Sequence, residues 1–159
     1  MYRSRLGRTG LALVASIACF GASVHAQTVI YVDATAPADG DGSTWSAAYR
    51  DLQDALSAAR ATPSVSEIRV AQGVYTPDRG SGDRSASFEL VNGRTLRGGY
   101  AGIAGADPDA RDLERYATVL SGDLAHDDAV TSQGGVPFFA NRADNSLHVV
   151  KLTGPTLLT

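Results

Sequence analysis

Hydrophobic residues recur with two different periods along the chain, and each period predicts a different element. From Trp45 to Ala61 the apolar residues are spaced three and four apart, with polar residues on the opposite side. This spacing is typical of one amphipathic helix. Ser43 or Thr44 can cap its first turn, and Pro63 ends it.

The hydrophobic period changes to two after this helix. Ile68 and Val70 alternate with charged residues, and Gln72-Gly73 predicts a turn before a further β-prone pair. Strands with a single helix do not alternate as βαβ units do, so we expect a mainly β fold rather than a doubly wound one. For the last β-prone segment the pattern leaves the buried face undecided. The other β-prone segments are 28–32, 87–91, 94–97, 118–121 and 146–152.

Asn92-Gly93 lies between two of these segments and has two interpretations. It predicts a hairpin that pairs residues 87–91 with 94–97 in antiparallel fashion. The alternative is a simple corner, because Asn and Gly tolerate positive φ in any tight bend. The sequence leaves both open.

The first 26 residues have the three parts of a secretory signal peptide: arginines, an apolar stretch from Leu11 to Val24, and small residues in Val24-His25-Ala26. A membrane anchor is the alternative, but the 14 apolar-stretch residues form a helix of about 21 Å, against a hydrocarbon core of roughly 30 Å. We therefore expect residues 1–26 to be removed. Residues 27–159 would then form one secreted or cell-surface domain.

The cysteine content and the net charge restrict how the protein could be anchored or cross-linked and which partners it could bind. The lone cysteine, Cys19, lies inside the predicted signal peptide and is followed by further apolar residues, so a lipoprotein anchor is not indicated and the mature chain would have no disulfide. Three of the 14 Lys and Arg precede residue 27, which leaves 11 basic against 17 acidic residues, a net charge of −6. This balance argues against nucleic acid as a partner. No apolar run is long enough to predict a membrane span.

Short motifs follow one another in a fixed order along the mature chain. In this order they resemble secreted bacterial right-handed parallel β-helix proteins of the pectin-lyase-like superfamily, over nearly all of residues 27–159. The order carries the resemblance, since no single motif is specific. The motifs are Ile30-Tyr31-Val32-Asp33, Asp41-Gly42-Ser43-Thr44-Trp45, Asp51-Leu52-Gln53-Asp54-Ala55-Leu56, Ile68-Arg69-Val70-Ala71-Gln72-Gly73-Val74-Tyr75, Leu96-Arg97-Gly98-Gly99-Tyr100-Ala101-Gly102, Arg111-Asp112, Thr118-Val119-Leu120-Ser121-Gly122-Asp123 and Asp144-Asn145-Ser146-Leu147-His148-Val149-Val150.

The resemblance implies a solenoid with an amphipathic helix over its N-terminal end, followed by coils that add strands to parallel sheets. An open solenoid end exposes apolar side chains and unpaired strand edges, so a cap is required there, and the helix over 45–61 suits that role. Family members generally continue through many more coils, whereas this chain stops after Leu157-Leu158-Thr159. We therefore expect the cap and one or two incomplete coils of a truncated protein, with marginal stability in isolation.

Candidate metal sites are few, and each has a simpler interpretation. Asp39 and Asp41, in Asp39-Gly40-Asp41-Gly42-Ser43, place oxygen atoms at alternate positions as calcium loops do, but a glycine-rich turn leading into a helix cap explains them better. His126-Asp127-Asp128, with His148, could offer transition-metal ligands, but a solvated loop is the simpler interpretation.

No residue is assigned to catalysis or to a cofactor. Gly98-Gly99 lacks the order of a dinucleotide-binding loop, and no nucleophile elbow occurs. Residues 79–84 read as an exposed insertion, and Asn145 as a structural residue inside a turn. In the related lyases and hydrolases, catalytic groups come from deeper coils that this chain does not reach.

The sequence leaves two functions open for the exported protein. The first is a secreted or cell-surface binding or structural module with an extracellular polysaccharide as its partner. The alternative is the N-terminal part of a polysaccharide lyase or glycosidase whose active site lies in missing coils, and acidic and basic residues clustered on one sheet of coils encoded beyond Thr159 would favour it. Tyr75, Tyr100 and Phe138-Phe139 could stack on sugars in either case, although packing in the core is the simpler role for them.

Overall fold

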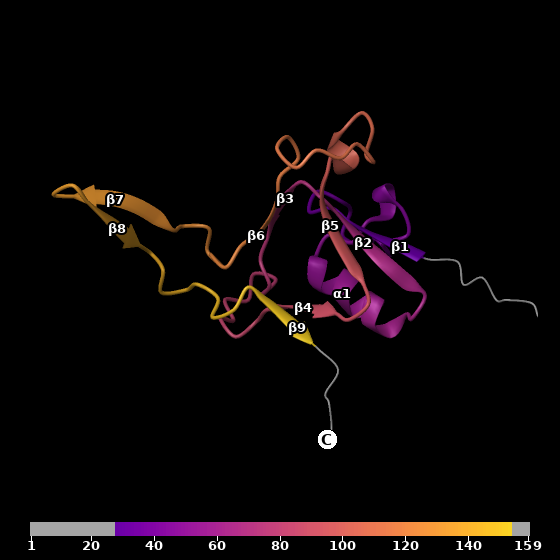
Figure 1. Cartoon of the computed structure of the whole chain (residues 1–159), viewed down its shortest axis with the longest axis horizontal. Coiled ribbons are helices and arrows are strands. Elements are labelled where there is room, and N and C mark those ends of the chain that lie inside the picture. The colour runs from indigo at the N-terminus through magenta and orange to yellow at the C-terminus, as the bar shows by residue number, and fades with distance from the viewer. Residues whose placement is uncertain (1–27, 154–159) are drawn as a thin grey trace, which may run out of the picture.

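The structure, a computed structural model, describes residues 28–153 as nine strands, one α-helix and two short 3-10 helices (Figure 1). The expected mainly β chain with one α-helix is confirmed for this range. The predicted signal peptide and residues 154–159 lie outside it. The elements are β1 (Thr28–Val32), η1 (Trp45–Ala47), α1 (Leu52–Ala61), β2 (Val65–Ala71), β3 (Gly73–Tyr75), β4 (Phe88–Val91), β5 (Thr95–Tyr100), η2 (Gly102–Ala104), β6 (Thr118–Leu120), β7 (Ala129–Gln133), β8 (Val136–Ala140) and β9 (Val150–Thr153).

Parallel pairing links strands that are distant in sequence. The chain runs through β2, β3 and β4 and then through β5, β6 and β9, and each strand of the second series pairs in parallel with its counterpart in the first. β1 adds a third strand to the β2–β5 sheet, in the order β1-β2-β5. The exception is β7–β8, which is antiparallel. The described part of the chain therefore consists of three small parallel sheets and one hairpin.

The core forms where alternating apolar residues of the parallel strands meet. Ile30, Ile68 and Leu96 are in register across β1, β2 and β5, and the first two are buried. Burying a large aliphatic or aromatic side chain contributes about 1.5–3 kcal/mol. The buried cluster comprises Ile30, Val32, Leu52, Ala55, Leu56, Ala59, Val65, Ile68, Val70, Tyr75 and Phe88.

The predicted helix over 45–61 is wrong in its first part. Thr44 caps only the short η1, where its hydroxyl accepts a hydrogen bond from the Ala47 N–H, and α1 begins at Leu52. Residues on either side of η1 bond to β1 instead: the Tyr31 N–H donates to the Gly42 carbonyl at 2.9 Å, and the Tyr49 N–H, between η1 and α1, donates to the Tyr31 carbonyl at 2.9 Å. Backbone groups at a strand edge need partners, and pairing with β1 outweighs continuation of the helix here.

Helix α1 packs its apolar side on β1, β2 and β4, as the amphipathic pattern requires. Its polar side contributes as well, because Gln53 Nε2 donates to the Pro77 carbonyl at 2.7 Å and to the Ser87 carbonyl at 3.0 Å. Both carbonyls belong to the segment that leads into β4. The helix therefore covers the apolar core and also satisfies backbone acceptors beside it.

The hairpin predicted at Asn92-Gly93 is wrong, and the corner interpretation is confirmed. β4 pairs with β9 and β5 pairs with β2, so the two strands flanking Asn92-Gly93 belong to different sheets. Gly93 has a φ of 73°, and the Arg94 N–H donates to the Val91 carbonyl at 3.2 Å. The tight bend uses residue types that a hairpin turn also prefers, but β4 and β5 each pair with a more distant strand instead of with one another.

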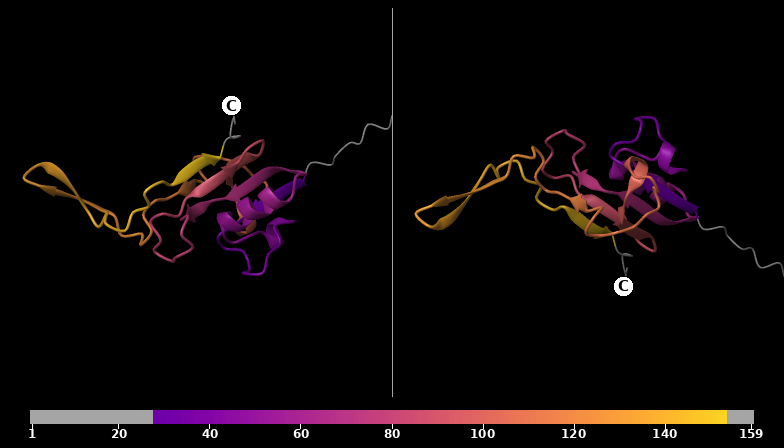
Figure 2. Two further views of the ribbon diagram at one scale, coloured as in Figure 1. Left: turned by 90° about the horizontal axis from the view of Figure 1, so that it is seen from below. Right: turned by 90° about the horizontal axis from the view of Figure 1, so that it is seen from above.

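The β7–β8 hairpin, which the strand pattern did not predict, projects far from the three parallel sheets (Figures 1 and 2). Gly134 and Gly135 form its two-residue turn with φ values of 62° and 83°. Both values fit a type I′ turn, the form that suits the twist of paired strands. In addition, the last strand begins at Val150, whereas the pattern predicts 146–152.

Candidate functional site

The exposed aromatic residues make the β7–β8 hairpin the candidate surface for contact with a partner. Tyr75 and Tyr100 are only 4% and 5% exposed, in agreement with their interpretation as core residues. Phe138 and Phe139 are each 55% exposed, so the core interpretation is wrong for this pair. Exposed apolar groups of this size on a soluble surface commonly mark contact sites.

The register of the hairpin places one phenylalanine on each face. Val130 pairs with Phe139, and Thr131 pairs with Phe138. Because side chains alternate along a strand, the adjacent rings point to opposite sides. Val130 and Val136 are also exposed, at 69% and 66%. No residue from 129 to 140 is charged.

One cation borders this apolar surface. The guanidinium carbon of Arg142 lies 5.3 Å from the centre of the Phe139 ring, within the range of a cation–π interaction. At the base of the hairpin, the Asn141 side-chain amide donates to the Asp127 carbonyl at 2.9 Å. The hairpin is therefore anchored at its base, while its two apolar faces are open to solvent.

Three carboxylates gather at the same base, from Asp123, Asp127 and Asp144. Asp123 accepts hydrogen bonds from the N–H groups of Asp127 and Asp128, each at 3.1 Å. Desolvation raises the pKa of Asp123, but these backbone donors and that of His126 outweigh it, so the pKa is lowered overall. Desolvation, followed by the charges of Asp144, Asp123 and Asp128, raises the pKa of Asp127. Backbone donors account for the approach of these acids.

The structure only partly assembles the predicted transition-metal residues. Asp127 joins Asp123 and Asp144, two acids that the sequence analysis did not select. His126 is exposed with a φ of 57°, and His148 is exposed and outside the group. Asp128 accepts from the Asn145 amide at 2.9 Å. The turn between these acids brings them together, and linear spacing gave no sign of it.

The predicted calcium residues lie elsewhere, between β1 and η1. The Ser43 N–H donates to Asp41 Oδ1 at 2.9 Å, and the Ser43 hydroxyl and then this N–H lower the pKa of Asp41. Asp39 is exposed, and neither acid joins the carboxylate group found among residues 28–153. Asp41 thus stabilises a turn before the capped η1, and calcium binding at Asp39 and Asp41 stays a prediction.

Acidic, basic and aromatic side chains also meet on the outer face of the β1-β2-β5 sheet. Arg69 donates to Glu67 at 3.0 Å and to Asp109 at 2.9 Å, and its guanidinium carbon lies 5.5 Å from the Tyr100 ring centre. Asp109 also accepts from Trp45 Nε1 at 3.1 Å. The mutual pairing of these groups binds two loops to the sheet. They come from separate segments, so only the strand register could have revealed them.

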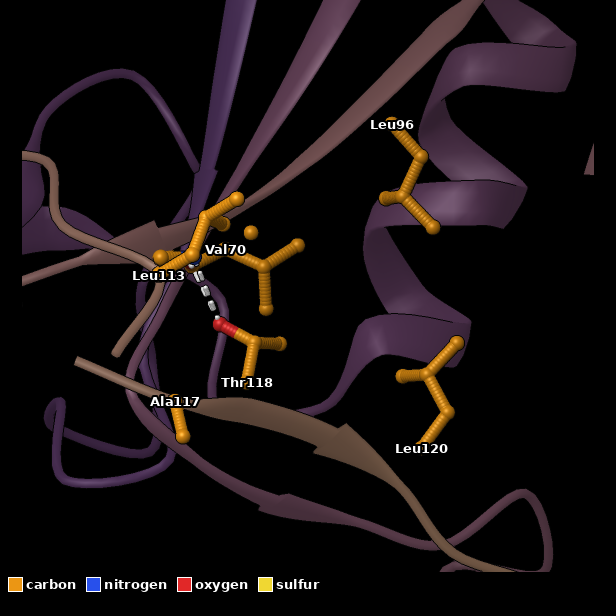
Figure 3. Close-up of a pocket in the computed structure, with 8 residues that line it drawn as sticks. Val70, Leu96, Leu113, Ala117, Thr118 and Leu120 are labelled. Carbon is orange, nitrogen blue, oxygen red and sulfur yellow. Dashed lines mark hydrogen bonds between the residues drawn. The ribbon is translucent and has the colours of Figure 1, made fainter. Parts of the chain in front are cut away.

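An apolar cavity of about 300 Å³ opens beside β5 and β6 (Figure 3). Thr118 lies in it with its hydroxyl bonded to main-chain groups, since it donates to the Ala71 carbonyl at 3.0 Å and accepts from the Gly99 N–H at 2.9 Å. The Gly99 amide is thereby occupied within the fold. The lining residues are Val70, Leu96, Gly98, Gly99, Leu113, Ala117, Thr118 and Leu120.

Comparison with known proteins returned no match, since no family model, no curated protein and no solved structure is similar to the chain. Among the described residues, none of the helices is long and apolar enough to cross a membrane. The geometry of the hairpin and of the sheets is therefore the basis for a functional proposal.

Proposed function

We propose that this protein is an exported module that binds an extracellular polysaccharide through the β7–β8 hairpin. The observation that carries the proposal is the 55% exposure of both Phe138 and Phe139 on an uncharged hairpin that projects from the body (Figure 2). The C–H faces of sugar rings are apolar and can pack on aromatic rings, while sugar hydroxyls remain hydrated. Rings on both faces would allow the hairpin to lie between two neighbouring sugar chains.

The proposed fold is the capped beginning of a right-handed parallel β-helix resembling the pectin-lyase-like superfamily. Support comes from the order of pairing, in which β2, β3 and β4 are matched in turn by β5, β6 and β9, all in parallel. Further support comes from α1, which packs on the side of β4 away from the second series. Right-handedness follows the general rule for parallel crossovers.

The proposed location is outside the cell or at its surface. It rests on the arginines, the apolar stretch and the small residues of positions 1–26, the pattern of a secretory signal peptide. The proposed mature chain would meet polysaccharides directly, and residues 27–159 would form no disulfide, because Cys19 is the one cysteine of the sequence.

A second candidate function, a polysaccharide lyase or glycosidase, has one observation in its favour. Glu67, Arg69 and Arg97 lie together on one sheet face, as such enzymes need. However, Glu67 accepts a hydrogen bond from Arg69 Nε at 3.0 Å and lies 3.9 Å from Arg97 Nε, so its carboxylate is already engaged in ion pairs with neighbouring side chains. Release of reducing ends or unsaturated sugars by the purified chain would favour the enzyme over the binding module.

The test of the binding proposal is sedimentation of the protein with a panel of insoluble polysaccharides, both neutral and uronic-acid-rich. Phe138→Ala with Phe139→Ala removes both rings and should weaken binding about tenfold, since each aromatic contact contributes on the order of 0.5–1.5 kcal/mol. Phe138→Leu with Phe139→Leu keeps apolar volume but removes the aromatic faces, and it should lose most of the same affinity. Leu113→Ala, at a residue 65% exposed outside the hairpin, is the control and should bind as the unaltered chain does.

Two results would refute the proposal. One is unchanged binding by the double alanine variant. The other is failure of the unaltered chain to sediment with any polysaccharide of the panel.

A further inference from the structure

The strands of the second series stack apolar side chains on the buried core. Paired residues of neighbouring parallel strands point to the same side of a sheet, so an inward residue of the first series places its partner inward as well. Within residues 28–153 no further strand lies over the second series, because β5, β6 and β9 are each the last strand of their sheet. The inward pairs are Ile68–Leu96, Tyr75–Leu120, Phe88–Val150 and Leu90–Leu152.

The inward side chains of the second series are open to solvent. Leu152 is 81% exposed and Val150 is 41% exposed, although their partners lie in the core or pack against it. The cavity of about 300 Å³ is lined by Leu96 and Leu120, and by Leu113, which is 65% exposed (Figure 3). These five uncharged residues, Leu96, Leu113, Leu120, Val150 and Leu152, are called the apolar floor below.

Free strand edges surround part of the apolar floor. Among the described residues, β6 pairs only with β3 and β9 only with β4, and neither strand forms backbone hydrogen bonds on its other side. The second half of β5 is covered, since Tyr100 bridges to Arg111 and the Asp112 N–H donates to the Gly99 carbonyl at 2.8 Å. Unpaired edges favour pairing with another strand. A matching occupant therefore offers strand edges as well as apolar side chains, which a sugar chain or a lipid does not.

A second copy of this chain can meet both requirements with the same end of its sheets. The opposite end is closed, because Gly42 and Tyr49 bond to β1 and α1 packs on β1, β2 and β4. A head-to-tail contact would therefore place the apolar floor against a capped surface. A twofold axis instead brings identical patches together, and a strand that meets its own copy across this axis runs antiparallel to it.

Charge and area are compatible with this contact. Arg97 is the one charged residue of β5, and it lies on the outer face of the sheet, 3.9 Å from Glu67. Burying a large aliphatic side chain removes about 60–120 Å² from water, so two apolar floors together account for about 600–1,200 Å². Stable complexes bury about 1,200–2,000 Å² in total, and smaller contacts are weak or transient. The area therefore favours a weak dimer.

We propose that the apolar floor is a dimer interface, at which two copies of this chain meet floor to floor and pair their free strand edges. This interface lies at the end of the parallel sheets and does not depend on the polysaccharide site proposed for the hairpin. Because the contact area is small, the copies form a reversible monomer–dimer equilibrium with a dissociation constant in the micromolar range rather than a permanent dimer.

Sedimentation equilibrium of the full chain, between about 1 and 500 µM, tests the proposal. Reducing conditions exclude a disulfide through Cys19. The unaltered chain should pass from monomer to dimer over this range. Leu152→Asp places a charge in the apolar floor at a side chain that is already 81% exposed, so the monomer should fold and the dissociation constant should rise at least about tenfold. Val130→Asp, at a hairpin residue 69% exposed, is the matched control and should leave the dissociation constant unchanged.

A monomer at every concentration, or dimerisation that Leu152→Asp does not weaken, would overturn the proposal. Equal weakening by Val130→Asp would also do so, because the hairpin would then join the copies. Circular dichroism checks that both variants are folded.

Hydrogen exchange provides a second measurement that needs no substitution. The amides of β6 and β9 that do not bond to β3 or β4 should exchange at least about threefold more slowly at the highest concentration than at the lowest, because edge pairing protects them. The amides of β7 and β8 should exchange at the same rate at both concentrations. Rates in β6 and β9 that do not depend on concentration would contradict the pairing of strand edges.

Discussion

The two hydrogen bonds from Gln53 to the segment before β4 make a quantitative prediction. Gln53→Met keeps the length of the side chain and its helix propensity but removes the donor of both bonds. Each hydrogen bond contributes about 0.5–1.5 kcal/mol net, so the free energy of unfolding should fall by about 1–3 kcal/mol. The loss arises because the Pro77 and Ser87 carbonyls no longer have this partner.

Thermal unfolding followed by circular dichroism measures this loss. At about 2.1 cal/mol/K per residue, the 126 residues from 28 to 153 have an unfolding entropy near 0.26 kcal/mol/K, so the melting temperature should fall by about 4–11 °C. Ser57→Ala is the control, because the exposed Ser57 hydroxyl bonds only to its own helix, at the Gln53 carbonyl. If the melting temperature of Gln53→Met stays within about 1 °C of that of the unaltered chain, water replaces the Gln53 amide at these carbonyls without loss of stability.

Three further variants test packing, backbone conformation and charge. Phe88→Ala removes a fully buried ring and should cost about 3–5 kcal/mol in urea unfolding, whereas Phe139→Ala, on the exposed hairpin, should cost under about 0.5 kcal/mol; similar losses would contradict the assigned core. Gly102→Ala and Gly80→Ala both place a side chain at positive φ, but only the methyl group at position 102 would clash with Asp33 and Ala71. Gly102→Ala should therefore lower the melting temperature more. Equal effects of the two variants would point to backbone strain alone. The raised pKa of Asp127 means that the fold disfavours its charged form, and this penalty is present above the folded pKa and absent once Asp127 is protonated. Asp127→Asn should therefore stabilise the protein at neutral pH and lose this advantage as the pH falls through that pKa. A constant advantage from acidic to neutral pH would exclude charge repulsion as its cause.

Local patterns predicted the strands better than their partners. A β-prone run identified β1, alternation identified β2, and the apolar spacing identified α1 although not its start. Parallel pairing depends on contacts between residues far apart in the chain, which periodicity cannot specify. Asn92-Gly93 illustrates the limit, since the same residues serve a hairpin or a corner and only the core decides.

The candidate site was harder to predict than the fold. Phe138 and Phe139 are apolar and were expected in the core, but their strand pairs only with β7 and projects into solvent. Gly134-Gly135 between two β-prone runs was the available signal for this hairpin. The acids Asp123, Asp127 and Asp144 meet through loop closure, which leaves no linear pattern. The expected marginal stability of the chain stays a prediction.

The pairing of Gly42 and Tyr49 with the edge of β1 restricts how copies of this protein could aggregate through their first sheet. Fibres grow when a molecule offers a sticky surface at both of its poles, so that every addition creates a new acceptor. Here the Tyr31 and Asp33 amides on one pole already donate to the Gly42 and Tyr49 carbonyls. Within the described residues, the β1 edge of the three-stranded sheet is therefore closed to a strand of another molecule at these positions, and the edge of β5 is the one left for such pairing in this sheet.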